Sequence, residues 1–222
     1  MKMLHIFING ASGKMGDALL ELSLKDDAIS VVTEKSSKKI DVVIDFSRPE
    51  SLINNLQEFK TTNIPFVIGT TGFSDEQIKL IEDESLARPI LLSFNMSKGI
   101  FTLKNSIKKF LQDNMHKLEC NIEEIHHISK VDAPSGTAIE IKNLIKKYDL
   151  AKNILSVNIV SKRIGDVFGI HKVSFKNDIN EVEFKHEALS RDVFAEGAIE
   201  IAKKILKKDP GLYQLEDFFE NK

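Results

Sequence analysis

Two adjacent histidines and a lysine lie within the sixteen-residue stretch from Glu123 to Ala138, EEIHHISKVDAPSGTA. The imidazoles of His126 and His127 can exchange protons near neutral pH. The ammonium group of Lys130 can pair with a carboxylate or donate a proton to a forming carbanion. Together these side chains predict a site for a small acidic molecule with a proton donor beside it.

A strand and a helix should position these side chains. The residues before the histidine pair are predicted to form a strand, and two neighbouring residues at a strand end point to opposite sides. Ser135 is predicted to cap a helix whose first turn offers the amides of Gly136 and Thr137, and such amides bind anions. The alternative is two half-buried histidines beside an ordinary capped helix. Their clustering with Lys130 favours a functional site.

Composition limits the classes of protein that the chain can be. With 222 residues it could form one large domain or two small ones. A net charge of −2 and scattered lysines argue against a nucleic-acid partner. Cys120 is the only cysteine, so neither an intramolecular disulfide nor a cysteine metal cluster is expected. The apolar run from Leu4 to Ile8 is too short for a signal peptide or membrane span, so we expect a cytoplasmic protein without a membrane partner.

The N-terminus has the pattern of a dinucleotide-binding turn. An apolar run at residues 3–9 predicts a buried parallel strand, and Gly10, Gly13 and Gly16 follow it before an apolar helix. Glycines let the backbone turn sharply and approach a pyrophosphate, and helix amides face that group. The spacing is G-x-x-G-x-x-G rather than the strict G-x-G-x-x-G, so glycines needed only for packing remain an alternative.

A second predicted strand, Ile29 to Thr33, ends at Glu34. An acidic residue at this position can hold a ribose diol, whereas Lys35 and the lysines after it could meet a 2′-phosphate. A solvated charged loop is the alternative for these lysines. The link from Lys35 to Asp41 is shorter than a usual parallel crossover. We therefore expect either a short second strand or a sheet that lacks one element on this side.

Apolar runs at 41–46, 65–68 and 89–93 alternate with amphipathic helices, and this alternation predicts an α/β fold with a Rossmann-like doubly wound parallel sheet. Ligands bind at the carboxyl ends of such strands. After residue 96 the pattern changes. A long helix at about 98–115 and three strand-like segments, 154–163, 171–176 and 181–188, predict a second α+β domain with a mixed or antiparallel sheet.

The chain resembles the dihydrodipicolinate reductase family, also named 4-hydroxy-tetrahydrodipicolinate reductase. The stretch at 123–138 is similar to the family signature E-x-H-H-x-x-K-x-D-A-P-S-G-T-A. The segments GASGKMG, DVVIDFSRPE, IGTTG and FNMSKG match in order, as do Ser161-x-Arg163, Gly169-x-His171 and His186-x-x-x-Ser190-Arg191. The resemblance implies reduction of a cyclic dicarboxylate by NADH or NADPH in lysine and diaminopimelate biosynthesis.

The resemblance also implies roles for single residues. His126 and Lys130 correspond to the family's proton donors, and His127 with the amides of Gly136 and Thr137 would contact a substrate carboxylate. The positions that match the family's cofactor site are Gly10, Ala11, Ser12, Gly13, Lys14, Met15, Glu34, Lys35, Gly69, Thr70, Thr71, Ser93, Phe94, Asn95 and Met96. Of these, Phe94 and Met96 depart from the residues common in the family.

The resemblance further implies that residues 1–96 and 191–222 form the dinucleotide-binding domain and that residues 97–190 form a substrate-binding and oligomerisation domain. A homotetramer that pairs the sheets of the second domains is then expected. Two alternatives remain open at this point. One is a dehydrogenase of another small amino or keto acid, and the other is a dinucleotide sensor without catalysis.

Overall fold

The computed structural model of the 222-residue chain describes residues 3–33, 35 and 39–219. The chain divides into two compact units, which we treat separately. Unit 1 contains residues 1–97 and 191–222, and unit 2 contains residues 98–190. Within the described residues, no helix is long and apolar enough to cross a membrane.

The sheet of unit 1 is parallel throughout. Its six strands lie in the order β10-β5-β4-β3-β1-β2. Their bounds are Leu4–Asn9 (β1), Ile29–Val32 (β2), Val42–Asp45 (β3), Phe66–Ile68 (β4), Pro89–Leu92 (β5) and Gly211–Tyr213 (β10). Strand order reverses between β1 and β3, which is where ligands bind in doubly wound sheets. The Rossmann-like prediction is therefore confirmed.

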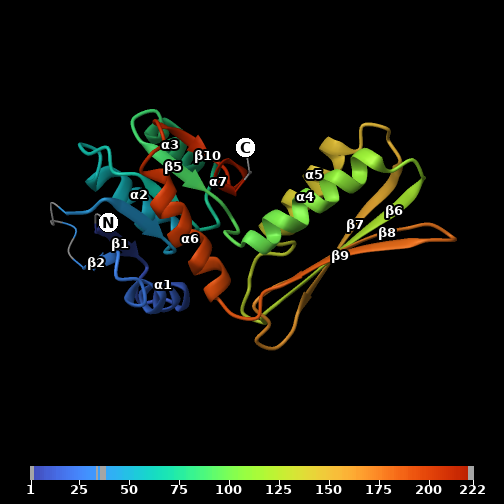
Figure 1. Cartoon of the computed structure of the whole chain (residues 1–222), viewed down its shortest axis with the longest axis horizontal. Coiled ribbons are helices and arrows are strands. Elements are labelled where there is room, and N and C mark those ends of the chain that lie inside the picture. Colours follow the sequence, from blue (N-terminus) through green and yellow to red (C-terminus); the bar gives the residue numbers. More distant parts are fainter. Residues whose placement is uncertain (1–2, 34, 36–38, 220–222) are drawn as a thin grey trace. The chain divides into compact units, whose positions relative to one another are not determined.

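Helices cover both faces of this sheet (Figure 1). Helices α1 (Lys14–Leu24) and α6 (Asp192–Ile205) pack together on one face, and α2 (Pro49–Glu58) and α3 (Asp75–Ser85) pack together on the other. A capping box between Ser74 and Gln77 starts α3, and a proline in the first turn suits the start of α2. A short helix, α7 (Glu216–Phe219), follows β10.

The sequence showed an unusually short link between the second and third strands, β2 and β3, and the structure shows how these strands are placed. Strand β2 has only four residues, and β2 and β3 lie on opposite sides of β1. Within the described residues between them, none is helical. Of the two alternatives, the short second strand is confirmed.

Unit 2 is built on a mixed sheet of four strands in the order β7-β6-β8-β9. The strands are Leu118–His126 (β6), Ile154–Arg163 (β7), Ile170–Lys176 (β8) and Glu181–Glu187 (β9). The β6–β7 pair is parallel, whereas β6–β8 and β8–β9 are antiparallel. The predicted second α+β fold is confirmed.

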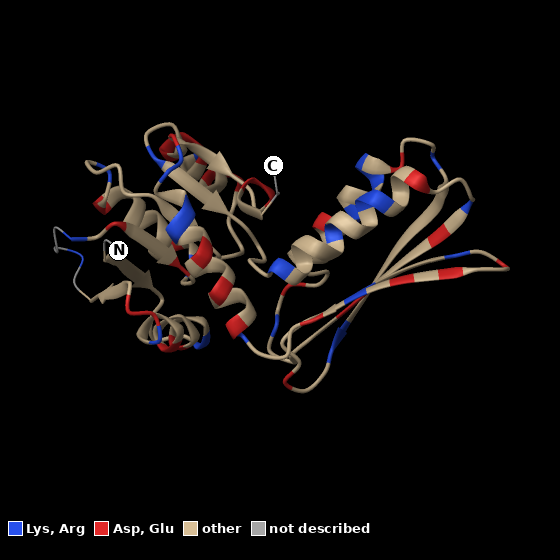
Figure 2. Cartoon of the chain, in the orientation of Figure 1, with Lys and Arg blue, Asp and Glu red and all other residues tan. Residues whose placement is uncertain are grey.

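Two helices, α4 (Lys98–Asp113) and α5 (Gly136–Tyr148), lie side by side on one face of this sheet (Figure 1). Helix α4 ends two residues before the predicted end at Met115. Ile107 of α4, Ile141 of α5, Ile122 of β6 and Phe175 of β8 meet in a fully buried core. The opposite face of the sheet has no helix over it within unit 2, and charges of both signs follow its strands (Figure 2). Side chains therefore have an inner, buried side and an outer, wet side.

Candidate active site

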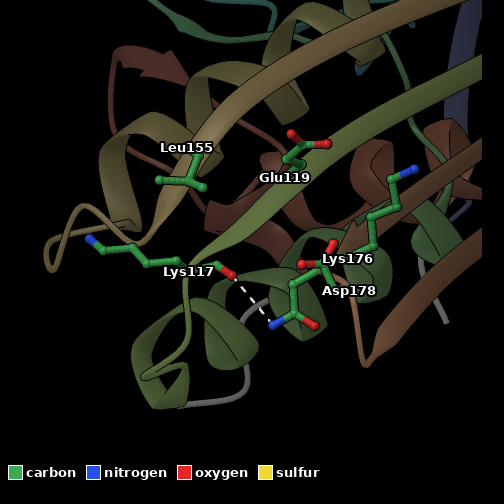
Figure 3. Close-up of a pocket in the computed structure, with 6 residues that line it drawn as sticks. Lys117, Glu119, Leu155, Lys176 and Asp178 are labelled. Carbon is green, nitrogen blue, oxygen red and sulfur yellow. Dashed lines mark hydrogen bonds between the residues drawn. The ribbon is translucent and has the colours of Figure 1, made fainter.

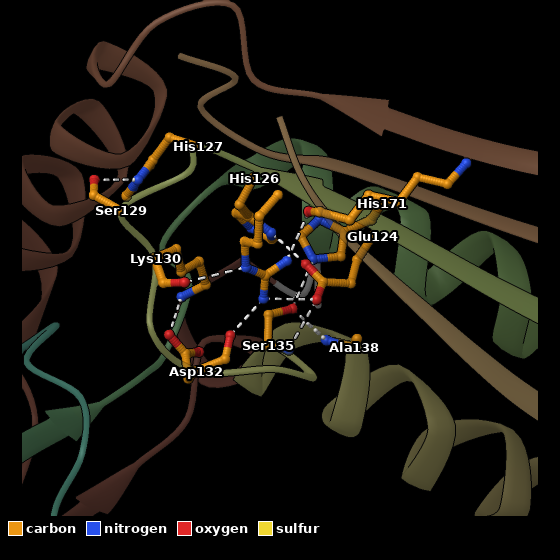
Figure 4. A network of polar contacts seen from close by, with 11 residues as sticks. Glu124, His126, His127, Ser129, Lys130, Asp132, Ser135, Ala138 and His171 are labelled. Atoms are coloured by element: carbon orange, nitrogen blue, oxygen red, sulfur yellow. Dashed lines mark hydrogen bonds and ion pairs between the residues drawn. The ribbon is translucent and has the colours of Figure 1, made fainter. Parts of the chain in front are cut away.

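His126 is the last residue of β6 and faces the inner side of the sheet. Alternation along the strand puts Glu124 on the same side, and both residues are buried. The Nδ1 atom of His126 makes a short hydrogen bond with the Glu124 carboxylate (Figure 4). Because a carboxylate only accepts hydrogen bonds, Nδ1 carries the proton in the neutral ring. The Nε2 atom is then the one that can take up or release a proton.

The second oxygen of Glu124 binds two further donors. The Nη2 atom of Arg163 lies 3.0 Å from Oε1, and the backbone amide of Ser135 donates to the same oxygen over 3.3 Å. Burial alone would raise the pKa of Glu124, but hydrogen bonds from Arg163 and Ser161 and the charge of His126 lower it below its ordinary value. Glu124 is therefore held as a buried carboxylate.

Arg163 also binds the loop between β6 and α5, residues 127–134. Its Nε atom donates to the carbonyl of Lys130 at 3.2 Å, and its Nη2 atom donates to the carbonyl of Asp132. Within the loop, Lys130 Nζ lies 2.7 Å from Asp132 Oδ1. The amide of Ile164 donates to the carbonyl of His126 at 2.9 Å, so the ends of β6 and β7 stay paired. One guanidinium group thus binds both the carboxylate that contacts His126 and the backbone that carries Lys130.

A row of polar side chains crosses the inner side of the sheet beside His126. Cross-strand pairing aligns Glu124 with His171 on β8, and His171 with His186 on β9. The rings of His126 and His171 meet edge to face, 5.2 Å between centroids. Burial lowers the pKa of His171 to about 3, and it also lowers the pKa values of His126 and His186. For His126, Glu124 partly offsets this effect.

Ser135 starts α5 in the way the sequence predicts. Its Oγ atom accepts a hydrogen bond from the amide of Ala138 at 3.3 Å, and it also contacts His171 Nε2 at 3.3 Å. Gly136 is partly exposed and Thr137 is buried. His127 lies outside the network around Glu124, and its Nδ1 atom is 2.8 Å from Ser129 Oγ (Figure 4). Roles for Gly136, Thr137 and His127 in carboxylate binding stay predictions.

Glu124, His126 and His171 also have the composition of a metal site, and their ligand atoms lie within 4.8 Å of one another. The charges around them favour a different use. The guanidinium of Arg163 already neutralises Glu124 at 3.0 Å, and a divalent cation would have to share that position. That the site holds no metal stays a prediction.

The glycine loop of unit 1, residues 10–16, fits a pyrophosphate. Gly10 has a φ of +85°, and a Cβ atom there would lie 2.4 Å from the carbonyl oxygen of Phe46. A Cβ atom on Gly16 would lie 2.3 Å from the carbonyl oxygen of Gly10. Gly13 is the N-cap of α1 and makes no side-chain cap, so no side chain takes the place of an anion at the first-turn amides. Ala11 and Met15 are partly exposed, and Ser12 and Lys14 are exposed.

The carboxyl ends of β1, β3 and β4 are joined by a buried carboxylate. Asp45 accepts hydrogen bonds from Asn9 at 2.6 Å, from the hydroxyl of Ser47 at 2.8 Å and from the hydroxyl of Thr70 at 2.6 Å. Asp45 is fully buried and Thr70 is nearly so. The sequence pointed to Thr70 as a cofactor contact, and the structure shows that its hydroxyl holds the loop in place. Asp45 itself was not singled out.

The other predicted cofactor residues vary in exposure. Thr71 and Phe94 are exposed, Gly69 and Asn95 are partly exposed, and Ser93 and Met96 are buried. Ser93 Oγ donates to the carbonyl of Asn95 at 2.9 Å and so shapes this loop. Lys35 pairs with Glu58 of α2 at 2.9 Å. Glu34 lies outside the described residues. The contacts of all these residues with a cofactor stay predictions.

A pocket of about 400 Å³ lies at the other end of β6 (Figure 3). It is lined by Lys117, Glu119, Leu155, Lys176, Asn177 and Asp178. Acidic and basic side chains alternate around it, and Lys117 already donates to the carbonyl of Lys152 at 2.8 Å. Since β6 has nine residues, a distance of roughly 25 Å separates this pocket from His126. The pocket is distinct from the polar network around Glu124.

Comparison with known proteins gives a consistent assignment. Residues 26–96 match the model of the dihydrodipicolinate reductase N-terminus, and residues 99–219 match that of the C-terminus. The 4-hydroxy-tetrahydrodipicolinate reductase of Bdellovibrio bacteriovorus is 35% identical over 226 residues, covering 98% of this chain and 96% of its own. That of Rickettsia bellii is 37% identical over 243 residues, covering 99% and 96%.

Solved structures show the same fold. A dipicolinate-bound dihydrodipicolinate reductase from Paenisporosarcina sp. TG-14 superposes with a TM-score of 0.73 at 20% identity, covering 98% of this chain and 100% of its own. The diaminopimelate dehydrogenase of Corynebacterium glutamicum gives a TM-score of 0.58 at 12% identity, covering 97% and 93%. At such identities the likeness concerns the fold alone. The matches to both family models and to the curated relatives show that the chain belongs to the dihydrodipicolinate reductase family, as its sequence predicted.

Proposed function

We propose that the chain reduces 4-hydroxy-tetrahydrodipicolinate to tetrahydrodipicolinate with NADH or NADPH, a step of lysine and diaminopimelate biosynthesis. Family membership over nearly the whole chain supports this function. The observation that carries the proposal is the arrangement at the end of β6, where Glu124 and Arg163 hold the His126 imidazole and the loop of Lys130.

His126 and Lys130 are proposed as the groups that hold and transfer the proton. When bound, a reduced nicotinamide supplies a hydride. The substrate ring loses its hydroxyl group as water before it accepts that hydride, and it must then gain a proton on the neighbouring carbon. The imidazole of His126 can deliver that proton from Nε2 once this atom has taken up a proton, because Nδ1 keeps its own proton bonded to Glu124. Lys130 can deliver it from Nζ, which Asp132 holds at 2.7 Å. The ammonium group of Lys130 would also attract a dicarboxylate substrate.

The substrate's carboxylates are proposed to bind the start of α5 and His127. Helix N-terminal amides attract anions, and Gly136 is partly exposed there. The relative from Paenisporosarcina was solved with dipicolinate, a molecule with two carboxylates, which supports a dicarboxylate as the ligand of this family. Thr137 is proposed to contribute through its backbone amide, because its side chain is buried.

The cofactor is proposed to bind unit 1, with its pyrophosphate on the glycine loop. The close backbone approaches at Gly10 and Gly16 leave no room for a Cβ atom at those two positions. Glu34 and Lys35 are proposed to lie at the adenosine ribose. Loops at the carboxyl ends of the sheet are proposed to meet the nicotinamide end, through Gly69, Thr70, Thr71, Ser93, Phe94, Asn95 and Met96.

One assay tests the function and its alternatives. Oxidation of NADH and of NADPH is followed in parallel at their absorbance, with substrate generated in situ by the synthase that makes it. Turnover that depends on this substrate is the expected result. Cofactor binding without turnover would support a sensor instead, and turnover only with another amino or keto acid would support a different dehydrogenase.

A homotetramer is proposed as the assembled state, with the outer face of the unit 2 sheet as the contact between copies. No helix of unit 2 covers that face, and Leu155 and Val160 are 65% and 42% exposed on β7. Equilibrium sedimentation of the full chain tests this part, and a monomer at micromolar concentration would contradict it. A cytoplasmic location stays a prediction from the sequence.

A further inference from the structure

We propose that Glu124 and Arg163 are positioning residues of the active site. Glu124 fixes the tautomer and direction of the His126 imidazole, and Arg163 fixes the backbone that carries Lys130. The inference rests on the proposed function, since it concerns the same two proton donors. Neither residue has to touch the substrate for this role.

Glu124 acts through two sets of bonds that face opposite ways. Its Oε2 atom accepts from His126 Nδ1, and its Oε1 atom accepts from Arg163 and from the amide of Ser135. The residue is fully buried, so water does not compete for these donors. Its carboxylate therefore leaves one tautomer for the neutral imidazole, with the lone pair on Nε2.

The surroundings of His126 restrict the ring further. His171 from β8 contacts it edge to face. Gly169 also lies close to the ring, since a Cβ atom added there would be 3.3 Å from Nε2. Lys130 from the loop and Arg163 from β7 are the cations that face it, and both oppose its protonation. Glu124 on the same strand is the charge that favours protonation. Its removal therefore changes both the direction and the acidity of the ring.

Arg163 connects this carboxylate to the loop. One guanidinium donates to Glu124, to the carbonyl of Lys130 at 3.2 Å and to that of Asp132. The planar fork of arginine can reach these acceptors together, whereas the single ammonium of a lysine cannot. The side chain thus fixes the backbone on both sides of Val131, which is 97% exposed. Without that anchor, the loop that carries Lys130 has little packing to hold it.

The substitution Glu124→Gln gives a distinctive prediction. Two donors, Arg163 and the Ser135 amide, face Oε1, so the glutamine must keep its carbonyl oxygen on that side. Its amide NH₂ then faces His126 Nδ1, which becomes an acceptor. The proton of the neutral ring moves to Nε2. The variant should therefore show the opposite tautomer of His126, which a role in stability alone would not produce.

The experiment uses the full chain labelled with ¹⁵N-histidine, together with steady-state kinetics. In the wild type, the ¹⁵N chemical shifts of the His126 ring should show that the proton is on Nδ1. In Glu124→Gln they should show that it is on Nε2. We expect kcat to fall by about 10- to 10²-fold in Glu124→Gln, because the ring loses the carboxylate that orients it and favours its protonated form, while the substrate still binds. Arg163→Lys should keep the wild-type tautomer and lose a similar factor in kcat, because the loop is no longer held.

Glu140→Gln is the matched control. It removes the carboxylate that pairs with buried Lys104 between α5 and α4, without contact to the network around Glu124. It should lower the melting temperature and leave kcat and the His126 tautomer unchanged.

Where Glu124→Gln does not fold, Glu124→Asp and Arg163→Lys carry the test. A wild-type tautomer in Glu124→Gln, or kcat within twofold of wild type in both Glu124→Gln and Arg163→Lys, would overturn the inference. Absence of turnover in the wild type would instead refute the proposed function, and the tautomer would still be measurable.

Discussion

The glycine loop of unit 1 and the strand end of unit 2 differ in what sets their geometry. In the glycine loop, backbone atoms lie so close that a Cβ atom on Gly16 would be 2.3 Å from a carbonyl oxygen. At the end of β6, one buried carboxylate and one guanidinium hold the groups through five hydrogen bonds and ion pairs. The first arrangement is damaged by adding an atom, whereas the second is damaged by removing a charge. Substitutions in the glycine loop of unit 1 should therefore mainly weaken cofactor binding, whereas substitutions at the strand end of unit 2 should mainly lower kcat.

The largest effect is expected when a proposed proton donor is removed from unit 2. Lys130→Ala and His126→Ala should each reduce kcat by about 10²- to 10⁴-fold, which is the usual contribution of a positioned acid or base. Cofactor affinity should stay within about twofold of wild type, because neither residue belongs to unit 1. Circular dichroism checks the fold, and titration of NADPH fluorescence checks the affinity. Normal turnover by either folded variant would remove that residue from the mechanism.

An intermediate effect is expected when an atom is added to the glycine loop. In Gly16→Ala the new methyl group would meet backbone atoms at 2.3 and 2.5 Å, so the loop must move. Backbone strain of that kind costs on the order of 1–3 kcal/mol, so the Kd for NADH or NADPH should rise about tenfold to 10²-fold. With saturating cofactor, kcat should recover, in contrast to the unit 2 variants.

Gly13→Ala is the graded comparison for that variant. Its Cβ atom would meet only the carbonyl oxygen of Gly10, at 3.3 Å, which a small shift can relieve. The Kd should change by about threefold or less, as calorimetry of both variants against wild type would show. Equal losses in Gly13→Ala and Gly16→Ala would mean that steric fit of the backbone does not set cofactor affinity.

Much of the scaffold was predictable because it rests on local patterns. The predicted segment 154–163 has the bounds of β7, and Ser135 caps α5 as its sequence context indicates. Strand β10 (Gly211–Tyr213) and helix α7 were not predicted. They are only three and four residues long, too short to show periodicity, and β10 exists because it pairs with β5.

The polar network could be predicted only in part. Alternation along β6 already puts Glu124 on the side of His126, so a buried carboxylate two residues from a candidate base was a usable signal. Arg163 and His171 matched the family pattern but had no role assigned to them. Their roles depend on the register of β7 and β8 against β6, which pairs Arg163 with His126 and His171 with Glu124. Register across 37 and 47 residues is not visible in local sequence.

The last effect concerns stability in acid rather than binding or turnover, and it comes from the buried histidines of unit 2. Burial lowers the pKa of His171 to about 3, with His126, His186 and Lys130 also opposing its protonation and Glu124 favouring it. The unfolded chain binds a proton at His171 near the ordinary pKa of about 6.5, so it binds more protons than the folded chain below that pH. The free energy of unfolding should therefore be at its full value above pH 6.5 and fall as pH decreases toward 3.

Between about pH 6.5 and 4.5, before most carboxylates titrate, His171 should contribute a slope of about 1.4 kcal/mol per pH unit. Urea unfolding measured across this range should show a smaller slope in His171→Gln than in wild type. Ser135→Ala removes the hydrogen bond to His171 but keeps the imidazole. It should lose about 1 kcal/mol at every pH, mainly from the lost helix cap, and keep the slope. If His171→Gln had the wild-type slope instead, the neutral buried imidazole would not be a source of the acid sensitivity of unit 2. The glycine loop of unit 1 and the polar network of unit 2 would then differ in their effects on binding and turnover, but not in their effects on stability.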